Sequence, residues 1–204
     1  MSTTASTQGF GKLDRSKLFS LEDYAQVRTS FRRDVIAHKL PRRVALDEGG
    51  HANLYFEDFT TMKYQVQEML RVERIFEPDG IQEEIDAYNP LIPDGSNWKA
   101  TFMLEYADVA ERRVRLGELI GVEDRVYVQV GEADRVFAVA DEDLDRETDE
   151  KTSSVHFLRF ELTPAMVQAV KDAGEVRIGV DHPAMTSEVV ISEETRASLA
   201  QDLT

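Results

Sequence analysis

The chain has 204 residues, a formal net charge of −15 at pH 7 and no cysteine. A chain of this length buries about 70% of its unfolded surface, so it needs neither a disulfide nor a metal to fold. The lack of cysteine excludes thiolate nucleophiles, thiolate zinc sites and cysteine-bound iron–sulfur clusters. The acidic charge disfavours nucleic acid and anionic membrane surfaces as partners, and we expect neither.

The first 18 residues are small and polar, without the apolar run of about seven to fifteen residues that a signal peptide requires. We therefore expect a flexible lead over residues 1–18, followed by a single domain over residues 19–204. No stretch approaches the roughly 20 apolar residues that cross a bilayer. The cytoplasm is the expected location.

Residues 20–38 have the pattern of an amphipathic helix. Ser20 is a suitable N-cap, and two carboxylates follow it in the first turn, where the helix dipole favours negative charge. The next segment, residues 42–58, has two short apolar runs, 44–46 and 54–56, on either side of a Gly-Gly pair, which predicts a β-hairpin. His51 comes directly after this turn.

A second helix, predicted over residues 60–77, places a carboxylate on its apolar side. The apolar stripe consists of Met62, Val66, Met69 and Phe76. At 100° per residue Glu73 falls at the centre of this stripe. Burying a carboxylate alone costs several kcal/mol, so Glu73 needs an arginine, a metal ion or several hydrogen bonds. Glu73 is therefore either one half of a structural ion pair or part of a functional site.

From Trp98 onward the hydrophobic period changes from helical to alternating. The sequence thus divides into a helical half, residues 19–95, and a sheet-rich half, residues 96–204. We predict an α+β fold, in which N-terminal helices and a hairpin pack on a mostly antiparallel β-sheet. The cleft between the two halves is the default binding site.

Residues 141–154 contain seven acidic side chains and almost nothing apolar. Such a segment cannot offset the entropy cost of its own ordering, so we expect a mobile acidic loop. Its alternating aspartates resemble the start of a calcium-binding EF-hand loop. The match fails at the sixth position, where Arg146 replaces glycine, and at the twelfth, where Thr152 replaces glutamate.

Two histidines lie on apolar faces of predicted strands: His156 in residues 155–162 and His182 in residues 175–182. If these strands are antiparallel neighbours, the imidazoles lie at the same end of the sheet; a parallel crossover would separate them. Two histidines and a carboxylate would suit iron or zinc. The candidate ligands are Glu73, His156, His182 and His51. The alternative is that each histidine is a satisfied core residue.

Several phrases of the sequence resemble a bacterial family catalogued only as a domain of unknown function. They are "LYFEDFTTMKYQVQEMLRVERIFE", "AYNPLIPDG", "IGVEDRVYVQV", "SSVHFLRFEL" and "VDHP". The resemblance covers residues 18–182 and supplies no catalytic residue. It implies genes encoded beside rubrerythrin-like di-iron proteins and iron–sulfur oxidoreductases of the heterodisulfide-reductase type.

The resemblance favours a non-catalytic accessory or docking protein of a bacterial redox or peroxide-stress system, binding an iron–sulfur or di-iron partner. An acidic surface suits transient encounters with a basic partner. Two alternatives stay open: a small metal-dependent enzyme or metal-binding protein with a His/Glu site, and a small-ligand-binding domain. The sequence does not decide whether the protein is an enzyme.

Overall fold

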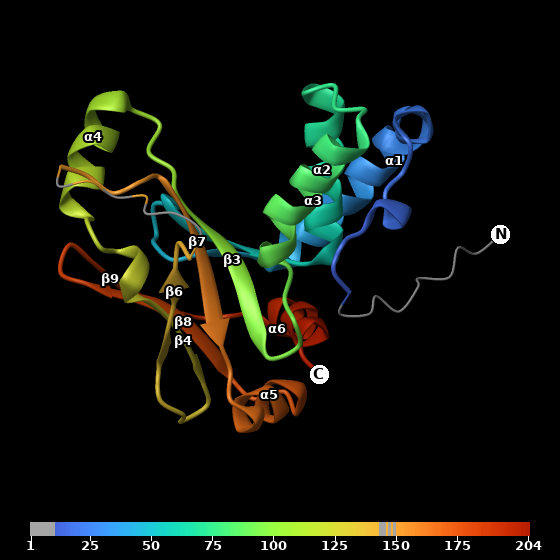
Figure 1. The fold of residues 1–204 in the computed structure, drawn as a ribbon. Helices are drawn as coiled ribbons and strands as arrows, with labels where there is room; N and C mark the ends of the chain where they lie inside the picture. The colour runs from blue at the N-terminus through green and yellow to red at the C-terminus, as the bar shows by residue number, and fades with distance from the viewer. Residues whose placement is uncertain (1–10, 143–145, 147, 149) are drawn as a thin grey trace.

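The structure, a computed structural model, describes residues 11–142, 146, 148 and 150–204 (Figure 1). A group of N-terminal helices lies beside two antiparallel sheets, which confirms the predicted α+β class. Among the described residues, no helix combines the length and the apolar character needed to cross a bilayer.

The helices, with η for 3-10 helix, are η1 (Arg15–Lys17), α1 (Leu21–Lys39), η2 (Leu40–Arg42), α2 (Phe59–Val72), α3 (Pro78–Tyr88), η3 (Asn89–Leu91), α4 (Val109–Glu118), η4 (Glu123–Arg125), α5 (Pro164–Lys171), α6 (Glu193–Leu199) and η5 (Ala200–Asp202). The strands are β1 (Arg43–Ala45), β2 (Ala52–Glu57), β3 (Asn97–Leu104), β4 (Val126–Val130), β5 (Val136–Phe137), β6 (Val139–Ala140), β7 (Val155–Glu161), β8 (Val176–His182) and β9 (Met185–Val190).

The strands form two sheets rather than the single sheet expected. The first sheet has the order β1-β2-β3-β7-β6 and the second β5-β4-β8-β9, with every neighbouring pair antiparallel. The predicted hairpin is present as β1 and β2, and Gly50 in its turn has φ of +68°, a conformation that glycine adopts without steric cost. Strands distant in sequence pair, as β3 with β7 and β4 with β8.

The two sheets enclose the larger hydrophobic core. Alternate residues of β3 and β4 point into it, as the period of two predicts, and Trp98, Phe102, Val126 and Val128 are fully buried. The indole Nε1 of Trp98 donates a hydrogen bond to the carbonyl oxygen of Leu199 at 2.9 Å. This bond connects α6 to the core between the sheets.

The helices α1–α3 have a second, smaller core. Its fully buried members are Leu13, Met62, Val66, Leu70, Ile85 and Ile92. Leu13 belongs to the expected flexible lead, yet it is 3% exposed, and its N–H donates to Asn89 Oδ1 at 2.7 Å. Residues 11–18 are therefore part of the packed structure, and the rest of that lead lies outside the described residues.

Arg42 connects the helices, the first sheet and the C-terminus. Its buried guanidinium donates to the carbonyl oxygens of Phe56 at 3.0 Å and Glu57 at 3.2 Å, and it contacts the Asp202 carboxylate at 2.5 Å. The Asp58 carboxylate, which caps α2, lies 3.7 Å from the same guanidinium. Buried charges need such partners, so this group fixes how the helical layer sits on the sheets.

Candidate metal centre

Glu73 is exposed, so the prediction that it occupies a buried stripe was wrong. Helix α2 ends at Val72, with Glu73 as its C-cap. Arg74 then takes the left-handed conformation, φ +55°, and the N–H of Ile75 bonds to the carbonyl of Leu70 at 3.0 Å. This is a Schellman-type ending, which usually has glycine at the left-handed position. Because α2 ends at Val72, the projection at 100° per residue does not apply to Glu73.

The carboxylate that α2 does shield belongs to Glu68. It accepts two hydrogen bonds from Arg28, at 2.7 and 2.8 Å, and one from the Tyr24 hydroxyl at 2.6 Å. The Arg28 hydrogen bonds, with help from Tyr24, lower the pKa of Glu68 to about 2. This pair connects α1 to α2 and is structural.

His51 and His182 do not meet His156. His182 lies in β8 of the second sheet and His156 in β7 of the first, so their strands are neither parallel nor antiparallel neighbours. Backbone groups satisfy both nitrogens of His182: it donates to the Ile120 carbonyl at 3.1 Å and accepts from the Ala184 N–H at 3.2 Å. This matches the core-residue alternative.

His51 occupies a separate polar pocket of about 200 Å³. Its Nδ1 lies 3.1 Å from Asp47 Oδ2, and its ring stacks on Tyr106 with centroids 4.8 Å apart. These contacts hold the ring in place beside the hairpin turn.

His156 is completely buried and has carboxylates on both sides. Its Nδ1 lies 2.6 Å from Asp141 Oδ2. On the other side of the ring, Nε2 lies 2.9 Å from Thr152 Oγ1, 3.1 Å from the Ser153 carbonyl and 3.6 Å from Glu123 Oε2. Within the described part of the chain, Glu123, Asp141 and His156 are the group of metal-binding residue types that converges, with ligand atoms within 4.8 Å of one another.

Separate elements bring these residues together. Glu123 begins η4, which leads into the second sheet, whereas His156 lies in the first. Asp141 follows β6 with a left-handed backbone, φ +45°, and its main chain and carboxylate both bond to Phe157, at 2.8 and 2.9 Å. The N–H of Thr152 donates to the Leu116 carbonyl at 3.0 Å. The cluster therefore joins the two sheets and both ends of the acidic segment.

The described ends of that segment are held in place rather than mobile. Thr152 is 1% exposed, and Arg146 bonds to Asp141 at 3.0 Å while lying over the Phe157 ring. Residues 143–145, 147 and 149, on which the rest of the mobile-loop prediction falls, lie outside the described residues.

The Nε2 side of His156 has the dimensions of a small metal site. Its Nε2, Thr152 Oγ1 and Glu123 Oε2 are separated by 2.9, 3.2 and 3.6 Å. A point equidistant from the three lies about 1.9 Å from each, close to the roughly 2.0 to 2.2 Å of zinc–nitrogen and zinc–oxygen bonds. A carboxylate on the opposite ring nitrogen, as Asp141 provides, is the arrangement that orients metal-binding histidines.

The site is closed. The side chains of His156, Glu123 and Asp141 are 0%, 8% and 9% exposed. Burial of these side chains would keep a bound ion out of contact with bulk solvent.

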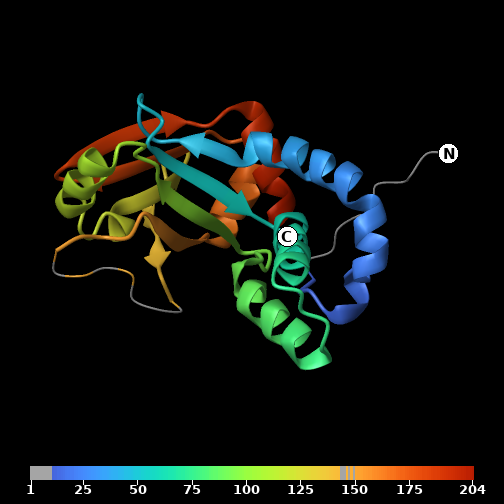
Figure 2. The same cartoon turned by 90° about the horizontal axis from the view of Figure 1, so that it is seen from above.

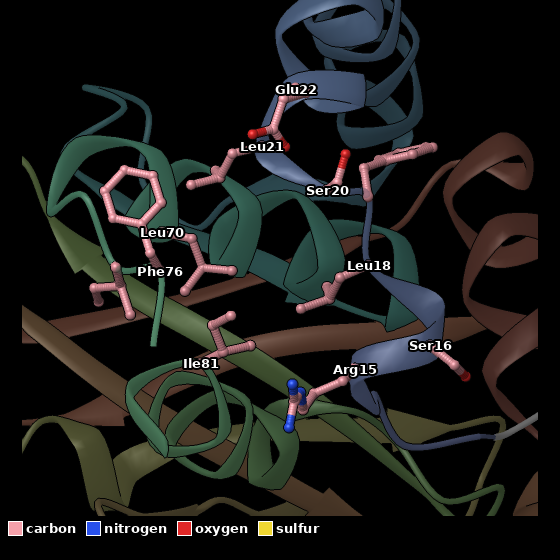
Figure 3. A pocket seen from close by; sticks show the side chains of 11 residues that line it. Arg15, Ser16, Leu18, Ser20, Leu21, Glu22, Leu70, Phe76 and Ile81 are labelled. Atoms are coloured by element: carbon pink, nitrogen blue, oxygen red, sulfur yellow. The ribbon is translucent and has the colours of Figure 1, made fainter. Parts of the chain in front are cut away.

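Two further hollows lie away from this cluster. A groove of about 760 Å³ runs among η1, α1, α2 and α3, where the side chains of Leu18, Leu21, Leu70 and Ile81 face one another (Figure 3). A smaller cavity of about 280 Å³ lies between the helices and the first sheet. We call it the interlayer cleft, lined mainly by Tyr88, Pro90, Leu91, Lys99, Glu142, Phe157 and Arg159. It lies where the sequence places the default binding site.

Fold and cluster together define a two-sheet α+β protein with an enclosed histidine–carboxylate group. The chain belongs to the family described as protein of unknown function DUF3501, which matches residues 12–203. A crystal structure of a novel protein of unknown function from Burkholderia pseudomallei K96243 is 50% identical in sequence, with a TM-score of 0.89. The match covers 95% of this chain and all of that one. No curated protein matches.

Three members of the cluster were missed from the sequence. Asp141 appeared only as the start of an acidic segment, and Thr152 only as a departure from the EF-hand pattern. Glu123 carried no signal, because it is brought to His156 by the packing of one sheet on the other. The spacing of residues along the sequence does not predict a contact of this kind.

Proposed function

We propose that the protein is a metal-binding domain with one enclosed site for a divalent ion at His156. His156 Nε2, Glu123 and Thr152 would be the ligands, and Asp141 would orient the ring. One imidazole nitrogen with oxygen donors, and no thiolate, suits zinc, iron(II) or manganese(II).

The observation that carries this proposal is that His156 in β7 and Glu123 in η4 converge, with His156 Nε2 3.6 Å from Glu123 Oε2 and both side chains buried. An ion bridging them would replace the contact between β7 and η4 by two metal–ligand bonds. It would also hold Thr152 and Asp141, one at each end of the acidic segment. Metal occupancy would then affect how firmly Asp141 and Thr152 are held.

A role beside a redox partner remains a prediction from the family resemblance. The proposed site is compatible with an accessory protein whose partner binding depends on the bound ion.

The test is equilibrium dialysis of chelator-treated, full-length protein against zinc and manganese, with bound metal measured by mass spectrometry. We expect one ion per chain. Glu123→Gln should weaken binding at least about tenfold, because a charged ligand is lost. Glu57→Gln is the matched control, since Glu57 is also 6% exposed but lies outside the cluster.

The proposal would be contradicted if the wild type bound no metal. It would also be contradicted if Glu57→Gln reduced metal binding as much as Glu123→Gln does. The first result would leave the cluster as a hydrogen-bonded support between the sheets. Thermal unfolding without metal checks that both variants are folded.

A further inference from the structure

One side of the interlayer cleft is mainly apolar and the other carries charged side chains. Tyr88 and Leu91, from the end of α3 and from η3, form one side. The other side is the outer face of the first sheet, where Lys99 and Arg159 are directly opposite each other on β3 and β7. Phe157 lies on the same face, two residues from Arg159. Figure 1 shows α3 standing beside β3.

Arg159 is fully paired. It makes two hydrogen bonds to Glu142, at 2.8 and 2.9 Å, and one to Glu161 at 2.9 Å. Its positive charge is therefore already matched by carboxylates of the chain itself.

Lys99 makes no such direct ion pair. It is half-buried, and no carboxylate among the described residues lies within 4.0 Å of its ammonium. Burial lowers its pKa, and the neighbouring cations Arg159 and Lys12 add to this shift, whereas the more distant carboxylates of Glu142 and Asp94 oppose it. A partly desolvated ammonium without a directly bonded carboxylate can pair with an anion from outside the chain.

We propose that the interlayer cleft binds a small organic anion, whose carboxylate-type group pairs with Lys99 and whose apolar body packs on Tyr88, Leu91 and Phe157. A cavity of about 280 Å³ suits a molecule of one ring or a short branched chain. In a chain with a net charge of −15, such a ligand needs a local cation and an apolar contact together. The inference is independent of the metal site.

The proposed anion binding can be tested by titrating the full chain with benzoate and monitoring the amide chemical shifts by NMR. Benzoate should bind saturably at millimolar concentration, as expected for about nine heavy atoms, and shift amides of β3, β7 and η3. Neutral benzamide, of the same shape, should bind about tenfold more weakly, because it lacks the charge.

Lys99→Met should reduce benzoate affinity about tenfold, whereas Lys99→Arg should retain most of it. Lys63→Met is the matched control, because Lys63 is another half-buried lysine whose pKa is lowered by burial, and it lies over Phe19 instead of in the cleft. Dispersed spectra verify folding of each variant. Equal binding of benzoate and benzamide, no saturable shift, or unchanged affinity in Lys99→Met would each overturn the inference.

Discussion

Glu68 and Glu73 show how far one residue's surroundings depend on where its helix ends. Both are near the C-terminus of α2, yet Glu68 meets Arg28 and Tyr24 while Glu73 faces solvent. Projection at 100° per residue assumes that the helix continues. The stop at Arg74 was not predictable, because arginine rarely takes the left-handed position that ends α2.

Glu68→Gln should lower the free energy of unfolding by about 1 to 3 kcal/mol at pH 7, since it leaves Arg28 without its carboxylate. Native Glu68 has a lowered pKa, so its contribution is present above the unfolded value of 4.5 and is lost as pH falls toward about 2. Urea unfolding at pH 7 and pH 3 measures both effects. Glu73→Gln should change stability by less than about 0.5 kcal/mol, and an equal loss in both variants would contradict this account.

Helices and strands follow the signals that neighbouring residues provide, namely N-cap residues and alternating apolar side chains. Ser20, Thr163 and Ser192 cap α1, α5 and α6 through their hydroxyls, and alternating apolar residues mark β3 and β4. The sequence did not predict which strands pair, because β3 meets β7 only after a connection of fifty residues, 105–154. Cross-strand contacts over such distances leave no periodic pattern.

The contact between Arg42 and Asp202, a residue of η5, predicts that the stability of the fold depends on pH. Burial raises the pKa of Asp202 to about 6, and nearby Asp58 adds to the rise. The positive charge of Arg42 opposes this shift but does not cancel it. The native state therefore holds this proton more tightly than the unfolded chain, whose carboxyl titrates near 3.8. Relative to Asp202→Asn, the wild type should lose up to about 3 kcal/mol of stability as pH rises from about 4 to about 6. The difference between their free energies of unfolding at pH 4 and pH 7 measures this, and a constant difference would refute it.

The molecule has two hydrophobic cores, one between the sheets and one among the helices α1–α3. Figure 2 shows the helical group at one end of the sheets. The alternation of apolar residues that begins at Trp98 predicted strand β3. The cluster around His156 was not predictable, since it depends on how two sheets pack.

Ile85 and Ile178 are both fully buried, one in each core. Ile85→Ala should cost about 2 to 5 kcal/mol and speed amide hydrogen exchange in α1–α3, while β4 and β8 keep their protection. Ile178→Ala should instead speed exchange in β4 and β8. Equal acceleration across the whole chain by Ile85→Ala would show that the two cores open together.

We propose above all that a divalent ion binds between Glu123 and His156. A crystal structure of the full chain grown with zinc, with diffraction data above and below the zinc absorption edge, locates the ion directly. We expect one anomalous peak about 2.0 to 2.2 Å from both His156 Nε2 and a Glu123 oxygen. Peaks at surface carboxylates, His51 or His182 alone, or no peak between His156 and Glu123, would contradict it.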